Sequence, residues 1–86
     1  MEIAKAFANA RIRIEGNTGN VGSRASNITL SQKRAEGVRD YLVSEHSMLR
    51  NRFIVTGNGP DKPVASNDTE TGRAKNRRTD FELVRE

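Results

Sequence analysis

Apolar and polar residues alternate along two stretches of the chain, which predicts β-strands with one buried face. The first stretch is residues 11–15, in which the two isoleucines share a face, and the second is residues 79–84. A continuous run at residues 53–56 predicts a third, largely buried strand. It is followed by Gly-Asn-Gly-Pro at residues 57–60, a sequence typical of a turn.

Three other segments have the spacing of helices. Residues 2–9 and, behind a capping threonine, residues 70–77 predict two short helices. A longer helix is predicted over residues 32–46 with Ser31 as its N-cap, after a loop of glycine and asparagine at residues 16–29. The predicted order is α-β-α-β-α-β, an α/β (α+β) sandwich in which a small mixed sheet carries its helices on one face.

Arg34 is the unusual residue of the long helix. In a helical projection it falls within an arc of four apolar residues, Ala35, Val38, Tyr41 and Leu42. A guanidinium there either reaches to the solvent edge or meets a carboxylate, and only the second makes a binding site. Lys33 and Arg34 are also expected in the first turn, where the helix dipole favours anions. This turn is therefore a candidate anion site.

Composition narrows the class of protein. With 86 residues, 34% of them apolar, the chain is expected to form one domain, residues 1–86. We find no apolar run of membrane-spanning length and no signal-peptide pattern, and the lack of cysteine excludes disulfides. The net charge of +4 favours partners that carry phosphate or carboxylate groups.

Two other function classes have less support. Basic clusters would suit a nucleic-acid-binding module, but the aromatic residues lie at apolar-periodic positions and are predicted to be core: Phe7, Tyr41, Phe53 and Phe81. An enzyme needs a nucleophile with an adjacent base, and His46 is the only histidine. We therefore expect no enzymatic activity, no metal or cofactor and no nucleic-acid partner.

Two blocks of sequence carry a family resemblance. Residues 27–35 read Asn-Ile-Thr-Leu-Ser-Gln-Lys-Arg-Ala, and residues 72–78 read Gly-Arg-Ala-Lys-Asn-Arg-Arg. In order and spacing, residues 12–82 resemble the OmpA-like peptidoglycan-binding domain of outer-membrane porins, peptidoglycan-associated lipoprotein and flagellar stator proteins. The resemblance implies a non-covalent cell-wall anchor in the periplasm, associated with the outer membrane through its parent protein.

The resemblance also implies a ligand and a site. The ligand is meso-diaminopimelate of the peptide stem, whose side chain ends in an ammonium and a carboxylate on one carbon. In the family an arginine and an aspartate share these charges, and Arg34 fills the arginine position. The further residues expected to line or support the pocket are Thr18, Gly19, Asn20, Gly22, Asn27, Arg77 and Arg78. Turn formation is the simpler role for the glycines.

The aspartate position departs from the family pattern, because it holds Gly19, and Asn17 stands in the place of a histidine. Losing one partner of a buried charge pair costs about 2–5 kcal/mol, so wall binding is expected to be weak. Three accounts stay open: an interaction module that no longer binds the wall, replacement of the acid by Glu15, Asn17 or Asn20, and an introduced Asp-to-Gly change.

The front of the chain departs as well. Family members begin with a strand before the first helix, whereas this chain starts within or just before that helix. The sheet is therefore expected to be one strand short. Because an open strand edge exposes unpaired backbone groups, we predict homodimerisation through this edge or marginal stability.

Overall fold

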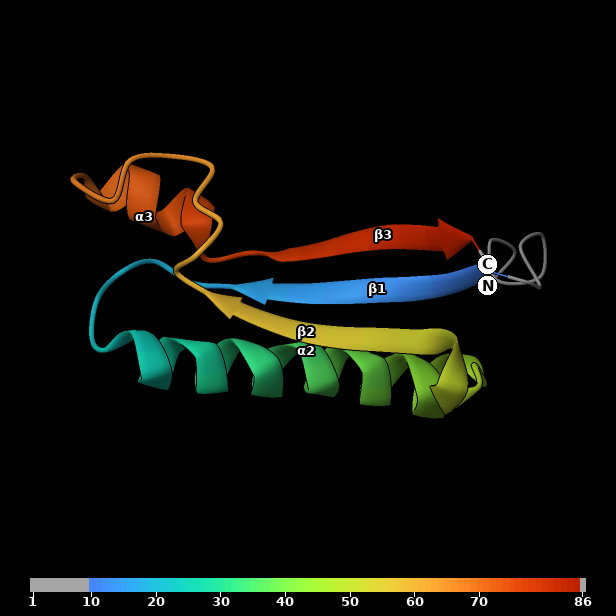
Figure 1. Ribbon diagram of the computed structural model, residues 1–86. Helices are drawn as coiled ribbons and strands as arrows, with labels where there is room; N and C mark the ends of the chain where they lie inside the picture. Colours follow the sequence, from blue (N-terminus) through green and yellow to red (C-terminus); the bar gives the residue numbers. More distant parts are fainter. Residues whose placement is uncertain (1–9, 86) are drawn as a thin grey trace.

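The computed structural model describes residues 10–85, which form one sheet with two α-helices (Figure 1). The elements are, in chain order, β1 (Ala10–Asn17), α2 (Arg24–His46), a 3₁₀ turn (Arg50–Arg52), β2 (Phe53–Gly59), α3 (Glu70–Asn76) and β3 (Thr79–Arg85). The predicted α/β class is confirmed, and the helix expected at residues 2–9 lies outside the described residues. Neither described α-helix combines the length and apolarity needed to cross a membrane.

β1 is the central strand of the sheet, whose order is β2-β1-β3. It pairs parallel to β2 and antiparallel to β3, so the sheet is mixed. A parallel pair needs a crossover, which α2 supplies. α2 lies along one face of the sheet, whereas α3 stands at its end beside the start of β3 (Figure 1). β2 and β3 form the edges of the described sheet, and homodimerisation through an edge stays a prediction.

The core lies between α2 and the middle of the sheet. Alternate residues of β1 face the helix, and Ile14 is completely buried there beside Ile12 and Ala35. The remaining core side chains are Val38, Leu42, Met48, Phe53 and Val55. Burying side chains of this size is worth about 1.5–3 kcal/mol each when complete, and the partly buried ones contribute correspondingly less.

The prediction that the aromatic residues are core is wrong for two of them. Phe81 faces Ile14 in the sheet register, yet 57% of its surface is exposed, and Tyr41 is 58% exposed. Both line an apolar hollow of about 480 Å³ beside α2. Phe53 does pack on the core, and Phe7 lies outside the described residues. Alternation indicates which face a side chain shares, but whether a helix covers that face depends on where the helix lies.

The start of α2 also differs from the prediction. The helix begins at Arg24, and its N-cap is Ser23, whose hydroxyl accepts a hydrogen bond from the backbone N–H of Ser26 at 3.0 Å. Ser31, the predicted cap, is fully buried within the helix. The predicted loop at residues 16–29 shrinks to residues 18–23 because β1 continues further and α2 starts earlier.

Candidate functional site

Glycines at the strand ends let the backbone of α2 lie directly on the sheet. A β-carbon added to Gly16 would collide with the carbonyl oxygen of Ser31. One added to Gly57 would lie 2.5 Å from the backbone nitrogen of Gln32. Residues 57–59 are therefore strand rather than the predicted turn. This close approach places the third turn of α2, which carries Arg34, beside the end of β1.

Ser31 joins α2 to β2. Its hydroxyl donates to the carbonyl of Ile28 at 2.9 Å and accepts from the backbone N–H of Gly59 at 2.9 Å. Gly59 has a φ of 55°, a conformation that favours glycine, and closes the strand. The serine of the family motif is thus an internal cross-link, which the sequence pattern did not reveal. Arg34 follows one turn later and is exposed.

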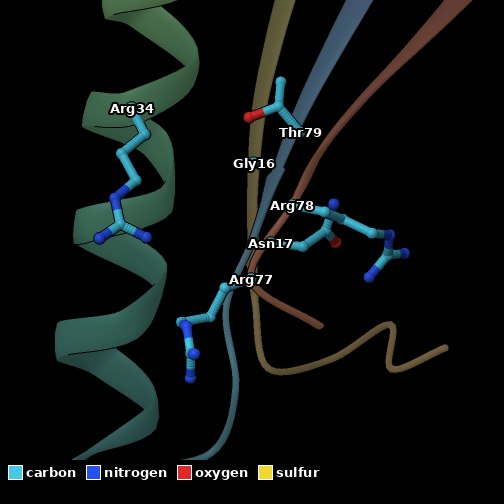
Figure 2. Close-up of a pocket in the computed structure, with 6 residues that line it drawn as sticks. All are labelled: Gly16, Asn17, Arg34, Arg77, Arg78 and Thr79. Atoms are coloured by element: carbon cyan, nitrogen blue, oxygen red, sulfur yellow. The ribbon is translucent and has the colours of Figure 1, made fainter. Parts of the chain in front are cut away.

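Arg34 lines an open cavity of about 220 Å³ (Figure 2). The other lining residues are Gly16, Asn17, Arg77, Arg78 and Thr79. Within residues 10–85, the Arg34 guanidinium has neither a hydrogen-bond nor an ion-pair partner. The prediction of an anion site from the helix dipole is wrong, because Arg34 lies near the middle of α2 and not in its first turn. What makes this place suitable for an anion is the uncompensated guanidinium itself.

The two arginines that follow α3 point to different sides of the strands (Figure 2). Arg77 lies on the side of Arg34 and donates to Glu70 at 2.8 Å, a contact that, with a second one from Arg73, lowers the pKa of the Glu70 carboxyl. Arg78 turns to the far side, where it pairs with Asp80 at 3.1 Å. Both arginines line the cavity, but only Arg77 lies on the side of Arg34.

The other predicted site residues belong to the connection between β1 and α2 or to the first turn of α2, and the cavity lining does not include them: Thr18, Gly19, Asn20, Gly22 and Asn27. Asn27 is buried and donates to the carbonyl of Val21 at 3.0 Å, which closes the loop. Thr18 is buried, with its N–H bonded to the carbonyl of Gly59 at 2.9 Å. Gly22 has a φ of 90°. Asn20 is exposed. Most of these residues shape the loop.

Gly19, at the position of the family aspartate, has room for a side chain. A β-carbon there would meet its nearest neighbours, atoms of Arg73 in α3, at 3.6–3.7 Å, which is ordinary van der Waals contact. The backbone of Gly19 does not adopt a positive φ, so other residues fit its conformation. The fold therefore has space for an aspartate at position 19, although the sequence has glycine there.

Glu15 and Asn17 are two of the possible substitutes for this acid, and of the two only Asn17 lines the cavity, with its side chain directed away from Arg34. Glu15 alternates with the buried isoleucines and so belongs to the sheet face opposite α2. Asn58 donates to both side chains, at 3.3 Å to Glu15 and 3.1 Å to Asn17, and Figure 2 shows Asn17 pointing away from Arg34. Lys62 bonds Glu15 at 3.0 Å, and this hydrogen bond is the main cause that lowers the pKa of Glu15. Both side chains are engaged in this network.

Asn76 fixes the segment from which Arg77 projects. It is fully buried, and its side-chain oxygen accepts from the N–H groups of Val64 and Ala65 at 2.8 and 3.0 Å. Its amide group donates to the carbonyl of Ala65 and to Asn67. The second family block therefore ties the loop before α3 to the end of the helix. Both polar atoms of the Asn76 side chain have partners, as is usual for a buried amide.

Comparison with known proteins identifies relatives over nearly the whole chain. The sequence model of the OmpA family matches residues 1–77. The chain is 40% identical over 85 residues to outer membrane porin F of Pseudomonas aeruginosa, covering 99% of this chain and 24% of the porin. It is 46% identical over 77 residues to the peptidoglycan-binding protein ArfA of Mycobacterium tuberculosis, covering 90% of this chain and 23% of that protein. The chain thus spans about a quarter of these two relatives.

Solved structures share the fold. The peptidoglycan-associated lipoprotein from Burkholderia pseudomallei is 35% identical, with a TM-score of 0.86 over 95% of this chain and 69% of that one. The cell wall anchor of the T6SS from Pseudomonas aeruginosa is 31% identical, with a TM-score of 0.76 over 98% of this chain and 62% of that one.

Proposed function

Because this chain belongs to the OmpA family, we propose that it anchors its parent protein to the bacterial cell wall by binding peptidoglycan without a covalent bond. Two relatives support the proposal by name, since one is a peptidoglycan-binding protein and another a cell wall anchor. The compartment that follows is the periplasm or cell envelope. The observation that carries the proposal is the exposed Arg34, unpaired among the described residues, at a cavity shared with Arg77.

The ligand of this proposal is the diaminopimelate of the peptide stem. A guanidinium presents parallel N–H groups that match the two oxygens of a carboxylate, and no residue in the range 10–85 occupies the donors of Arg34. Arg77 adds a second cation on the same side, although Glu70 offsets part of its charge. Arg34 therefore holds the carboxylate at the end of the ligand side chain, and Arg77 strengthens the field around it.

Gly19 weakens this binding in our proposal. No acid among the described residues lines the cavity, so the ammonium of the ligand has no partner there. The expected loss of about 2–5 kcal/mol corresponds to a roughly thirtyfold to several-thousandfold weaker complex. Because a β-carbon at this position meets only ordinary contacts, Gly19→Asp is expected to fold and to regain affinity.

An NMR titration with a stem tripeptide ending in meso-diaminopimelate tests the proposal. We expect small shifts around Arg34 and residues 17–27 in the natural chain, larger ones in Gly19→Asp, and none in Arg34→Ala. Lys33→Ala is the matched control, because Lys33 is an exposed neighbouring cation that does not line the cavity. Silence in both the natural chain and Gly19→Asp would refute wall binding and favour an interaction module built on the same fold.

Nucleic-acid binding gains no support from the exposed aromatic residues. Tyr41 and Phe81 line the apolar hollow beside α2, and the lining of that hollow within the described residues contains no lysine or arginine. Surfaces that stack bases combine aromatic rings with a cationic groove along the backbone. The exposed aromatic rings and the cationic cavity therefore lie in different parts of the fold.

A further inference from the structure

The cavity beside Arg34 has a one-sided charge. Among the described residues its lining contains three arginines and no carboxylate. The acids that bond two of them are Glu70, held by Arg77, and Asp80, held by Arg78. Arg34 has no such acid in the part of the chain that the structure describes. A ligand that enters therefore meets an uncompensated positive charge, which attracts a carboxylate and repels an ammonium.

The loop beside the cavity cannot supply the missing negative charge in this structure. Gly19 has no side chain, and a β-carbon added there would lie nearest to a further arginine, Arg73. Asn20 is neutral, and Glu15 is bonded to Lys62 and Asn58 on the other face of the sheet. The charge balance at Arg34 therefore stays positive until the ligand itself contributes an anion.

This balance separates two kinds of carboxylate. In a free amino-acid end, the ammonium sits on the same carbon as the carboxylate, so a bound carboxylate brings a positive charge to about 5 Å from the guanidinium. At that distance, repulsion weakens binding between roughly fourfold and several-hundredfold, depending on the effective dielectric constant. When the nitrogen is acylated, it carries no charge and this penalty disappears, while the carboxylate still binds.

We infer that the Arg34 cavity selects carboxylates whose neighbouring nitrogen is acylated over free amino-acid zwitterions, because its lining within the described residues holds three arginines and no acid. The inference rests on the proposed function and names the part of the wall that fits. In a peptide stem such groups are the carboxylate at the peptide's C-terminus and a diaminopimelate end whose amine is joined to another stem. A free diaminopimelate end is the disfavoured form.

Four small probes test the selectivity, with binding followed by NMR shifts at constant salt. D-Alanine and N-acetyl-D-alanine model a free amino acid and a peptide end. D-Norleucine and N-acetyl-D-norleucine, each with a single carboxylate, model the side-chain end of an unlinked and of a linked diaminopimelate. We expect the natural chain to bind each acylated probe about tenfold more tightly than its zwitterionic counterpart.

Variants at position 19 and at Arg34 assign the effect to charge. Gly19→Asp is expected to abolish or reverse the preference, whereas Gly19→Asn, which has the same shape without the charge, is expected to keep it. Arg34→Ala is expected to bind none of the probes, and Lys33→Ala to behave as the natural chain. A preference for only one acylated probe would show which of the two sources the cavity accepts.

Contrary outcomes are distinguishable. Equal or tighter binding of the zwitterions by the natural chain would overturn the selectivity and leave wall binding intact. Binding seen only in Gly19→Asp, and only for the zwitterions, would also overturn it, because the cavity would then require an acid. No Arg34-dependent binding of any probe by any variant would overturn the proposed function itself.

Discussion

The two halves of α2 rest on the sheet by different means. Residues 24–35 contain all of the helix's buried side chains, two of them polar, and lie against glycines at the ends of β1 and β2. Residues 36–46 instead pack through Val38 and Leu42, both only partly buried, against the isoleucines of β1. Contact in the first half depends on backbone fit and hydrogen bonds, whereas contact in the second depends on apolar area.

This difference has consequences for function. A backbone held within contact distance of another backbone has little freedom to shift, since close-packed interiors do not yield easily. Arg34 lies within this constrained half, beside the ends of the strands. The constrained half therefore positions the site, and the apolar half contributes stability that tolerates change.

Gly16→Ala is expected to have the largest effect on stability. The added methyl group would overlap the carbonyl oxygen of Ser31, and neither backbone can give way without shifting α2. We expect a loss of about 3 kcal/mol or more in the free energy of unfolding, measured by urea denaturation. A loss below about 1 kcal/mol would mean that the helix and strand can separate cheaply, and the distinction between the two halves would fail.

Ser31→Ala tests the hydrogen bonds of the same half. The change leaves the buried N–H of Gly59 without its acceptor, at an expected cost of about 2 kcal/mol. Ser44→Ala is the matched control, because Ser44 is exposed on the apolar half of the helix and should change stability by less than about 0.5 kcal/mol. Similar losses in the two variants would show that the Ser31 cross-link adds nothing specific.

Leu42→Ala addresses the apolar half. Leu42 packs on the core but is only partly buried, so its truncation is expected to cost about 1–2 kcal/mol, less than the 2–5 kcal/mol of a fully buried leucine. Leu42→Met should cost less than about 1 kcal/mol, because a flexible side chain of similar volume can refill the space. A large loss in Leu42→Met would indicate that this half is as constrained as the other.

The same difference explains what the sequence could predict. Apolar spacing at Ala35, Val38 and Leu42 revealed the second half of α2, because that half packs through such side chains. The first half has no apolar stripe, since Asn27 and Ser31 are its buried residues, and the helix start was therefore placed too late. Glycines at the strand ends were the available signal for a close-lying helix, but they were interpreted as a loop and a turn.

The site shows a similar division. Arg34 emerged from the helical projection and from the family motif, and its neighbour Arg77 from the second motif. The dipole argument reached Arg34 through a helix start that is wrong. The direction of Arg78 and the engagement of Asn17 with Asn58 depend on contacts between segments distant in the sequence, which no local pattern contains.

Gly37→Ala is expected to raise stability. Gly37 lies in the interior of α2 just beyond the constrained half, and a β-carbon there would meet nothing within 4 Å. Close packing among the described residues therefore does not require glycine at this position. Because alanine is favoured over glycine in helices by about 0.8–1.0 kcal/mol, we expect a gain of up to about 1 kcal/mol in thermal or urea unfolding. A loss of stability would reveal a contact on that side of the helix.

Arg34→Ala is expected to change stability least and binding most. Its guanidinium is exposed and has no partner within the described residues, so truncation removes no hydrogen bond or ion pair. We expect the free energy of unfolding to stay within about 0.5 kcal/mol of the natural value, because surface changes away from such contacts are usually this small. Urea denaturation and the stem-peptide titration, performed on the same samples, separate the two effects. A loss of about 2 kcal/mol in unfolding would show that Arg34 serves the fold, since a residue reserved for a ligand contributes nothing to stability when the ligand is absent.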